Sequence, residues 1–209
     1  MSAGAALDQP LGSPLCLRAP VFADLIGGLD EGQRHVILDL GPARSGLIER
    51  LNVLRCRLDV LDLTRHLSHL IQLQSDDDER AQQAILAKSL PSGRPEPVQI
   101  VLCWDLLDYL PLAVTARLLT LLRERLAPAA RLHALVEYAS PHMPISPRRI
   151  GPNLEGNLLV EATAPELGPA PRHSVGTLAS HLPGFRAERS MLLGNGMQEY
   201  LFRFSAANV

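Results

Sequence analysis

The feature that most constrains the fold of this chain is an apolar run that stops at a glycine-proline turn and is followed by a helical segment. Residues 35–40 read His-Val-Ile-Leu-Asp-Leu, which is typical of a buried strand, and Gly41 and Pro42 end it. Residues 45–54 then carry leucine and isoleucine at helical spacing. A strand, a tight turn and a helix in this order form the start of a βαβ unit. The chain is therefore expected to build a parallel sheet.

The same alternation of strands and helices continues along the sequence. We expect further strands at 56–63, 98–103, 131–138 and 158–162, and helices at 22–29, 45–54, 64–73, 76–90, 111–126 and 174–182. Residues 140–157 are rich in proline and are interpreted as coil. The runs 185–193 and 198–204 flank Gly194, Asn195 and Gly196, which predicts a closing antiparallel hairpin whose last strand joins the sheet. The expected fold class is α/β: a Rossmann-like, mostly parallel sheet with helices on both faces and an antiparallel C-terminal edge hairpin.

Length and composition favour one domain. With 209 residues and 46% apolar residues, the chain can bury one substantial core. Residues 1–18 are rich in Ala, Gly, Ser and Pro without periodicity, and are interpreted as a flexible tail. Residues 19–209 are expected to form the single domain.

Charge and cysteine content argue against several classes of protein. A net charge of −2 gives no broad positive field for nucleic acid, and no apolar run reaches the length of a membrane span. Residues 1–20 lack a basic segment followed by an apolar stretch, so no signal peptide is expected. Cys16, Cys56 and Cys103 are far apart and form no CxxC pair, which favours reduced thiols over disulfides or zinc. A cytoplasmic protein is the expectation.

Four segments, in order, resemble the class I S-adenosylmethionine-dependent methyltransferases. They are 36–41 (Val-Ile-Leu-Asp-Leu-Gly), 58–62 (Leu-Asp-Val-Leu-Asp), 100–105 (Ile-Val-Leu-Cys-Trp-Asp) and 118–132, within a match that spans about 36–138. The resemblance implies an enzyme that binds S-adenosylmethionine and transfers its methyl group to an acceptor. A small-molecule acceptor is favoured, and the sequence identifies no catalytic residue.

The resemblance also implies which residues meet the cofactor. Asp39, Gly41 and Ala43 lie at the glycine turn, where a missing Cβ lets the backbone approach the methionine part. Asp62 ends the second strand and can accept hydrogen bonds from the ribose hydroxyls, or else cap the helix that follows. Trp104 and Asp105 follow the next strand, where they either flank the adenine or substrate, or cover the sheet and cap a turn.

The glycine turn departs from the usual GxGxG pattern and keeps a second function open. Pro42 has no N–H, and Ala43 and Ser45 add side chains where glycine is usual. The segment between Asp62 and residue 98 is helical and polar and shows no third strand. The alternative function is therefore a catalytically inactive methyltransferase fold that acts as a binding module or scaffold.

Other candidate residues are open to two interpretations. Glu137, Tyr138 and His142 follow a strand and could include a general base. Arg148 and Arg149 either contact an acidic substrate or partner, or are solvated. His66 and His69 could form a metal pair, and the acidic residues 75–79 could bind a metal. For the two histidines a solvated helix face is favoured, and for the acidic residues the N-terminus of a helix is favoured. No metal site is therefore expected.

Overall fold

The computed structural model of the chain describes residues 14–72, 76–90 and 96–205. Its central sheet has the strand order β10-β11-β5-β4-β2-β3. The strands are β2 (His35–Asp39), β3 (Cys56–Val60), β4 (Val98–Trp104), β5 (Leu126–Glu137), β10 (Phe185–Leu192) and β11 (Met197–Phe204). β2, β3, β4 and β5 are parallel, so the predicted parallel sheet is confirmed.

The C-terminal hairpin is confirmed as well. β11 runs antiparallel to both β10 and β5, so the last strand lies inside the sheet and β10 forms the edge. Gly196, in the hairpin turn, has a φ of +87°, and a Cβ there would come within 2.9 Å of the Ala139 side chain. Glycine is required at this position both for its backbone conformation and for its lack of volume.

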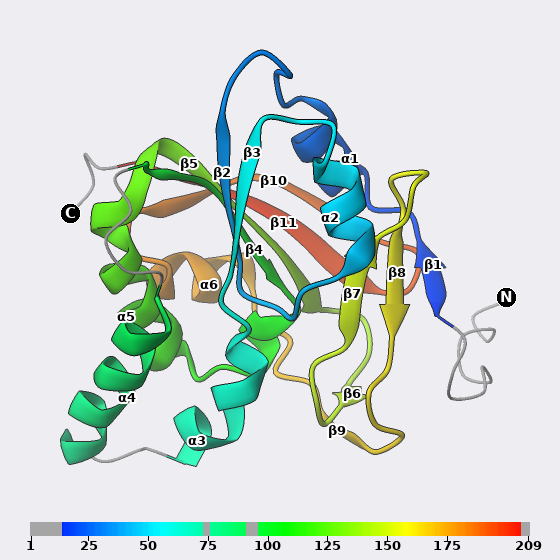
Figure 1. Cartoon of the computed structure of the whole chain (residues 1–209). Coiled ribbons are helices and arrows are strands. Elements are labelled where there is room, and N and C mark those ends of the chain that lie inside the picture. The colour runs from blue at the N-terminus through cyan, green and yellow to red at the C-terminus, as the bar shows by residue number, and fades with distance from the viewer. Residues whose placement is uncertain (1–13, 73–75, 91–95, 206–209) are drawn as a thin grey trace, which may run out of the picture.

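Helices cover both faces of the sheet (Figure 1). α4 (Asp76–Ser89), α5 (Leu112–Leu122) and α6 (Val175–His181) lie on one side, and α1 (Pro20–Gly27) and α2 (Ser45–Leu51) lie on the other. α3 (Leu67–Gln72) follows a 3-10 helix (Leu63–His66) beyond the carboxyl ends of the strands. Val36 and Leu38 of β2 point into the core on the α5 side, while Ile37 points to the α1 side. None of the helices in the described ranges is long and apolar enough to cross a bilayer.

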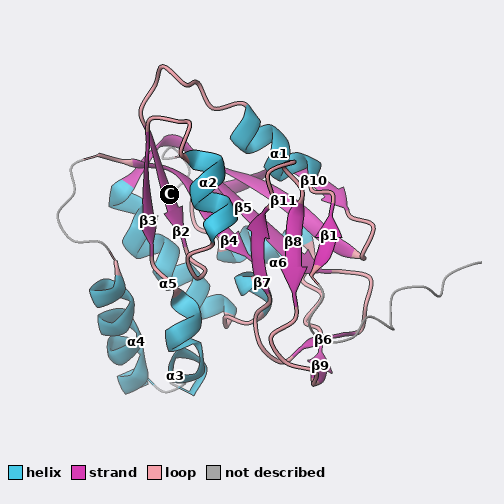
Figure 2. Cartoon of the chain, turned by 45° about the vertical axis from the view of Figure 1, so that its right-hand side comes forward, coloured by secondary structure: helices cyan, strands magenta, loops and turns pink. Residues whose placement is uncertain are grey.

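Two small sheets lie outside the main one (Figure 2). The first has the order β1-β8-β7, and the second pairs β6 with β9. Their bounds are β1 (Leu15–Leu17), β6 (His142–Pro144), β7 (Arg149–Pro152), β8 (Leu158–Glu161) and β9 (Leu167–Pro169).

Two of these short strands lie in the segment for which the sequence predicts proline-rich coil. The coil interpretation of 140–157 is wrong for β6 and β7, because strands of three or four residues with prolines carry no period-2 signal. β1 lies in the segment interpreted as a tail, where it pairs with β8. This pairing joins Leu15 to Val160, and local sequence patterns do not reveal a contact between residues so far apart in the chain.

The buried last strand leads to a prediction about stability. Phe202 of β11 is fully buried and its ring lies 5.4 Å from that of Tyr200. Phe202→Ala should lower the free energy of unfolding by about 3–5 kcal/mol, because it removes packing from the middle of the sheet. Arg203→Ala, at an exposed position of the same strand, should change it by less than about 0.5 kcal/mol. Urea unfolding measures both, and equal effects would contradict the buried position of β11.

Candidate functional site

The candidate site lies at the carboxyl ends of β2 and β4. The chain passes from β2 to β3 on one side and later returns to β4 on the other, so the strand order reverses between β2 and β4. Ligands of open α/β sheets bind in the crevice that forms at such a reversal. Asp39, Gly41, Trp104 and Asp105 all lie at this edge, at or just beyond the ends of the two strands.

Asp39 connects the two strand ends. Its side chain is fully buried, and its Oδ1 accepts hydrogen bonds from Gly41 N at 2.9 Å and from Trp104 Nε1 at 2.7 Å. Its Oδ2 is also buried and has no hydrogen-bond partner. Burial raises the pKa of Asp39 to about 7, although the two hydrogen bonds act in the opposite direction. The carboxyl group therefore takes up a proton near neutral pH.

Trp104 lies directly over the glycine turn. The residue has a φ of +50°, and the pairing of β4 with β5 shifts register between Leu102 and Trp104. A bulge of this kind re-aims the side chain that follows it. The indole ring is 2% exposed and lies 5.6 Å from the ring of Phe22. A Cβ at Gly41 would lie 2.7 Å from Trp104 Cδ1, so the space beside this glycine holds the chain's own indole.

A second glycine at the beginning of α2 is also covered by protein. A Cβ at Gly46 would overlap the carbonyl oxygen of Pro152, the last residue of β7. Gly151 in turn lies against the side chain of Arg44. β7 is therefore packed onto the first turn of α2. With Trp104 over Gly41 and Pro152 over Gly46, the residues present do not fit S-adenosylmethionine in this conformation. Ala43 lies between the two glycines and is exposed.

Asp62 lies next to the glycine turn, two residues beyond the end of β3. Its negative charge contributes to the raised pKa of Asp39. Its own carboxylate accepts hydrogen bonds from Thr64 Oγ1 at 2.5 Å and from Arg65 Nε at 2.6 Å. It makes no side-chain hydrogen bond to the backbone of the 3-10 helix that it precedes. The acid is thus near the position that the resemblance implies, and both of its oxygens are engaged.

A buried group of acids lies at the end of β5 and just beyond the end of β4, and Arg148 is inserted between two of them. Arg148 Nη2 lies 2.7 Å from Glu137 Oε2, and Arg148 Nη1 lies 3.4 Å from Asp105 Oδ2. The backbone N–H of Arg148 also donates to Asp105 Oδ2 at 3.0 Å. Asp108 accepts a hydrogen bond from the backbone N–H of Glu137 at 2.7 Å. Arg148 supplies the positive charge that buried carboxylates at this edge require.

Residues 140–148, which we call the strap, are held over this acidic group. The hydroxyl of Tyr109 lies 2.8 Å from the carbonyl oxygen of Pro144 and 2.9 Å from that of Ser146. Burial raises the pKa of Asp108 to about 8 and also raises that of Asp105, while Arg148 acts in the opposite direction on both. The strap thus covers the β4 and β5 end of the crevice, as β7 covers the β2 end.

The structure separates the remaining candidate residues. Glu137 is buried and paired with Arg148, whereas Tyr138 is 46% exposed and His142 is also exposed. Arg149, His66 and His69 are exposed, and the described residues contain no group of side chains suited to a metal ion. The side chains of 76–78 lie outside the described part of the chain. Sequence reasoning missed Asp108 and Tyr109, although the spacing of Asp105 and Asp108 directly after a strand was a usable signal.

The chain is distantly similar to several solved structures. No family model and no curated protein matches the chain. Solved structures do. The pyocyanin biosynthetic protein PhzM has a TM-score of 0.47 and 16% identity, covering 88% of this chain and 54% of its own. The Burkholderia thailandensis 1,6-didemethyltoxoflavin-N1-methyltransferase, with S-adenosylhomocysteine bound, has a TM-score of 0.47 and 18% identity, covering 89% of this chain and 77% of its own. The glycopeptide N-methyltransferase MtfA, complexed with S-adenosylmethionine, has a TM-score of 0.46 and 12% identity, covering 95% of this chain and 99% of its own.

The chain has a Rossmann-like α/β fold. The strand order β10-β11-β5-β4-β2-β3, with an antiparallel last strand inside the sheet, is the observation on which this assignment rests. The chain spans about half the length of PhzM. At these identities and TM-scores the likeness supports no conclusion about the site, so the site must be interpreted from this chain's own residues.

The position of Arg148 leads to a prediction about stability. Arg148→Met removes the charge and leaves Asp105 and Glu137 buried without a cation, which should cost about 3–5 kcal/mol of unfolding free energy at pH 7. Arg149→Met, at the exposed neighbouring position, should cost less than about 0.5 kcal/mol. Urea unfolding measures both. A small effect of Arg148→Met would show that the acidic group does not need its cation.

The raised pKa of Asp39 leads to a prediction about pH. Because the folded-state pKa of about 7 exceeds the ordinary value of 3.8, the folded protein binds the extra proton and loses stability as pH rises between these values. Asp39→Asn keeps an acceptor for Gly41 and Trp104 but cannot ionise. Relative to this variant, the wild type should lose up to a few kcal/mol between about pH 5 and pH 8.

Unfolding of the two proteins across this pH range measures the difference, and other groups such as Asp108 cancel because both proteins contain them. Glu31→Gln, at an exposed loop position, serves as the control and should follow the wild type. A constant difference between wild type and Asp39→Asn would contradict a protonated Asp39.

Proposed function

We propose that this chain is a non-catalytic methyltransferase fold that acts as a binding module or scaffold. The observation that carries the proposal is the indole of Trp104, which lies against Gly41 and donates its N–H to Asp39. In this arrangement the ring occupies the space that the resemblance assigns to the methionine part of the cofactor. The ring is part of the core, because it is 2% exposed and packs against Phe22.

Two further contacts support the same proposal. Pro152 covers Gly46 at the start of α2, and Arg148 fills the acidic group at the ends of β4 and β5. Opening the crevice would therefore require three changes at once: displacement of a buried ring, separation of β7 from α2 and removal of Arg148 from two carboxylates. Separating a buried charge pair alone costs several kcal/mol. The closed form is thus the stable one.

Calorimetric titration with S-adenosylhomocysteine and S-adenosylmethionine tests the proposal. The expected result for the full chain is no heat of binding and no rise in melting temperature at ligand concentrations up to about 1 mM. A dissociation constant above this concentration corresponds to a binding free energy weaker than about −4 kcal/mol. A dissociation constant in the micromolar range would overturn the non-catalytic proposal and restore the methyltransferase as the favoured function.

If binding is observed, two aspartate variants locate it. Asp62 lies near Asp39, two residues beyond the end of β3, whereas Asp59 lies within the strand and contacts Arg57. Loss of affinity by about 30- to 150-fold in Asp62→Ala, with little change in Asp59→Ala, would place the ribose at Asp62. Unchanged affinity in both variants would place the ligand elsewhere.

A further inference from the structure

The exposed edge of β3 has a sequence that is complementary to itself. Within the described residues, β3 is the last strand on its side of the sheet. The hydrogen bonds from His35 N to Arg55 O and from Leu61 N to Asp39 O show that the odd-numbered residues direct their backbone groups toward β2. The N–H and C=O of Leu58 and Val60 therefore point away from the sheet, as a template for another strand.

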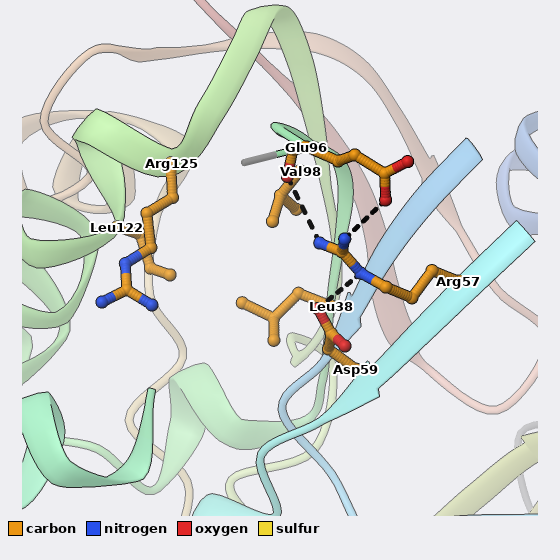
Figure 3. A pocket seen from close by; sticks show the side chains of 7 residues that line it. All are labelled: Leu38, Arg57, Asp59, Glu96, Val98, Leu122 and Arg125. Carbon is orange, nitrogen blue, oxygen red and sulfur yellow. Dashed lines mark hydrogen bonds and ion pairs between the residues drawn. The ribbon is translucent and has the colours of Figure 1, made fainter. Parts of the chain in front are cut away.

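The two faces of β3 differ in chemistry. Cys56 and Leu58 pack against the core on the α1 side, and Val60 is 40% exposed. On the other face, Arg57 Nε lies 3.1 Å from Asp59 Oδ2, and Arg57 Nη1 lies 2.6 Å from Glu96 Oε2. Figure 3 shows Arg57 and Asp59 projecting from β3 on the same side. One face of the edge strand is thus apolar, and the other alternates in charge.

We propose that β3 pairs with β3 of a second copy of this chain, antiparallel and with the two-fold axis at Leu58. This register places Arg57 opposite Asp59 of the second copy, and Asp59 opposite Arg57. Each of these two side chains then has an opposite charge two residues away in its own strand and another directly across in the partner strand. It also places Cys56 opposite Val60 on the apolar face. A parallel pairing in register would bring like charges together, so the charge pattern selects the antiparallel pair.

The opposite edge of the sheet lacks these properties. β10 carries a register shift between Ala187 and Arg189, and such a bulge disrupts pairing with a further strand. Charged side chains usually protect an edge strand because they meet like charges in a neighbouring copy. In β3 the antiparallel register removes this protection. The pairing involves five residues from each copy, so we expect a weak dimer.

Sedimentation of the full chain from about 10 to about 500 μM tests the association, over the range expected for a small interface. The expected result is a concentration-dependent shift from monomer to dimer. Arg57→Asp and Asp59→Arg should each weaken association at least about tenfold, because two like-charge pairs replace two opposite ones. An equimolar mixture of the two variants should associate again, which misfolded variants could not do. Arg186→Asp, on the opposite edge, is the control and should behave as wild type.

Cysteine cross-linking tests the register. In a background with both Cys16→Ser and Cys56→Ser, which removes the exposed and the partly buried native thiols, Leu58→Cys places two thiols opposite each other at the axis, within the Cα separation of about 4.4–6.8 Å that a disulfide requires. Mild oxidation should give a disulfide-linked dimer on a non-reducing gel. Val60→Cys in the same background should not cross-link, because its counterpart lies four residues along the pair, about 13 Å away.

Two outcomes would overturn the proposal. One is a chain that stays monomeric at the highest concentration. The other is a dimer that folded Arg57→Asp and Asp59→Arg do not weaken, which would place the interface elsewhere. Neither outcome depends on whether S-adenosylmethionine binds, so this inference stands apart from the proposed function.

Discussion

The buried carboxyl group of Asp39 is the constraint on which the candidate site depends. It ends β2, holds the backbone of Gly41, and accepts the indole N–H of Trp104 from the end of β4. The two central strands are therefore joined at the point where the strand order reverses. Because this group is fully buried, its hydrogen bonds do not compete with water, and the ring stays over the glycine turn.

The other half of the same edge is filled by a different kind of interaction. Asp105 and Glu137 are buried acids that need a cation, and the strap supplies Arg148 from within the chain. The β7 strand that follows the strap covers Gly46. A ring, a carbonyl and a guanidinium from this chain thus fill one crevice in which related folds would place ligands. This arrangement is why we favour binding through the outer surface over methyl transfer.

The parallel core of the fold could be predicted because its signals are local. Residues 35–40 and 98–103 are apolar runs bounded by turn residues, and the helix between successive strands requires a right-handed crossover. The hairpin could be predicted from Gly194 to Gly196 for the same reason. β1, β6 and β7 could not, because such short strands are stabilised by partners far away in the sequence.

The sequence by itself determined that the core strands are parallel members of one sheet, that the turn after residue 40 departs from the glycine-rich pattern, and that Asp39, Asp62 and Asp105 lie at or just beyond strand ends. Only the tertiary structure decided what these residues do. Asp39 binds an indole 65 positions away, and Asp105 binds an arginine 43 positions away. Periodicity and turn residues predict the local structure of a few neighbouring residues. What fills a crevice depends instead on which side chains from distant parts of the sequence reach it. A backbone at positive φ and a bulge in β4 direct Trp104 onto Gly41, and neither has a sequence signal.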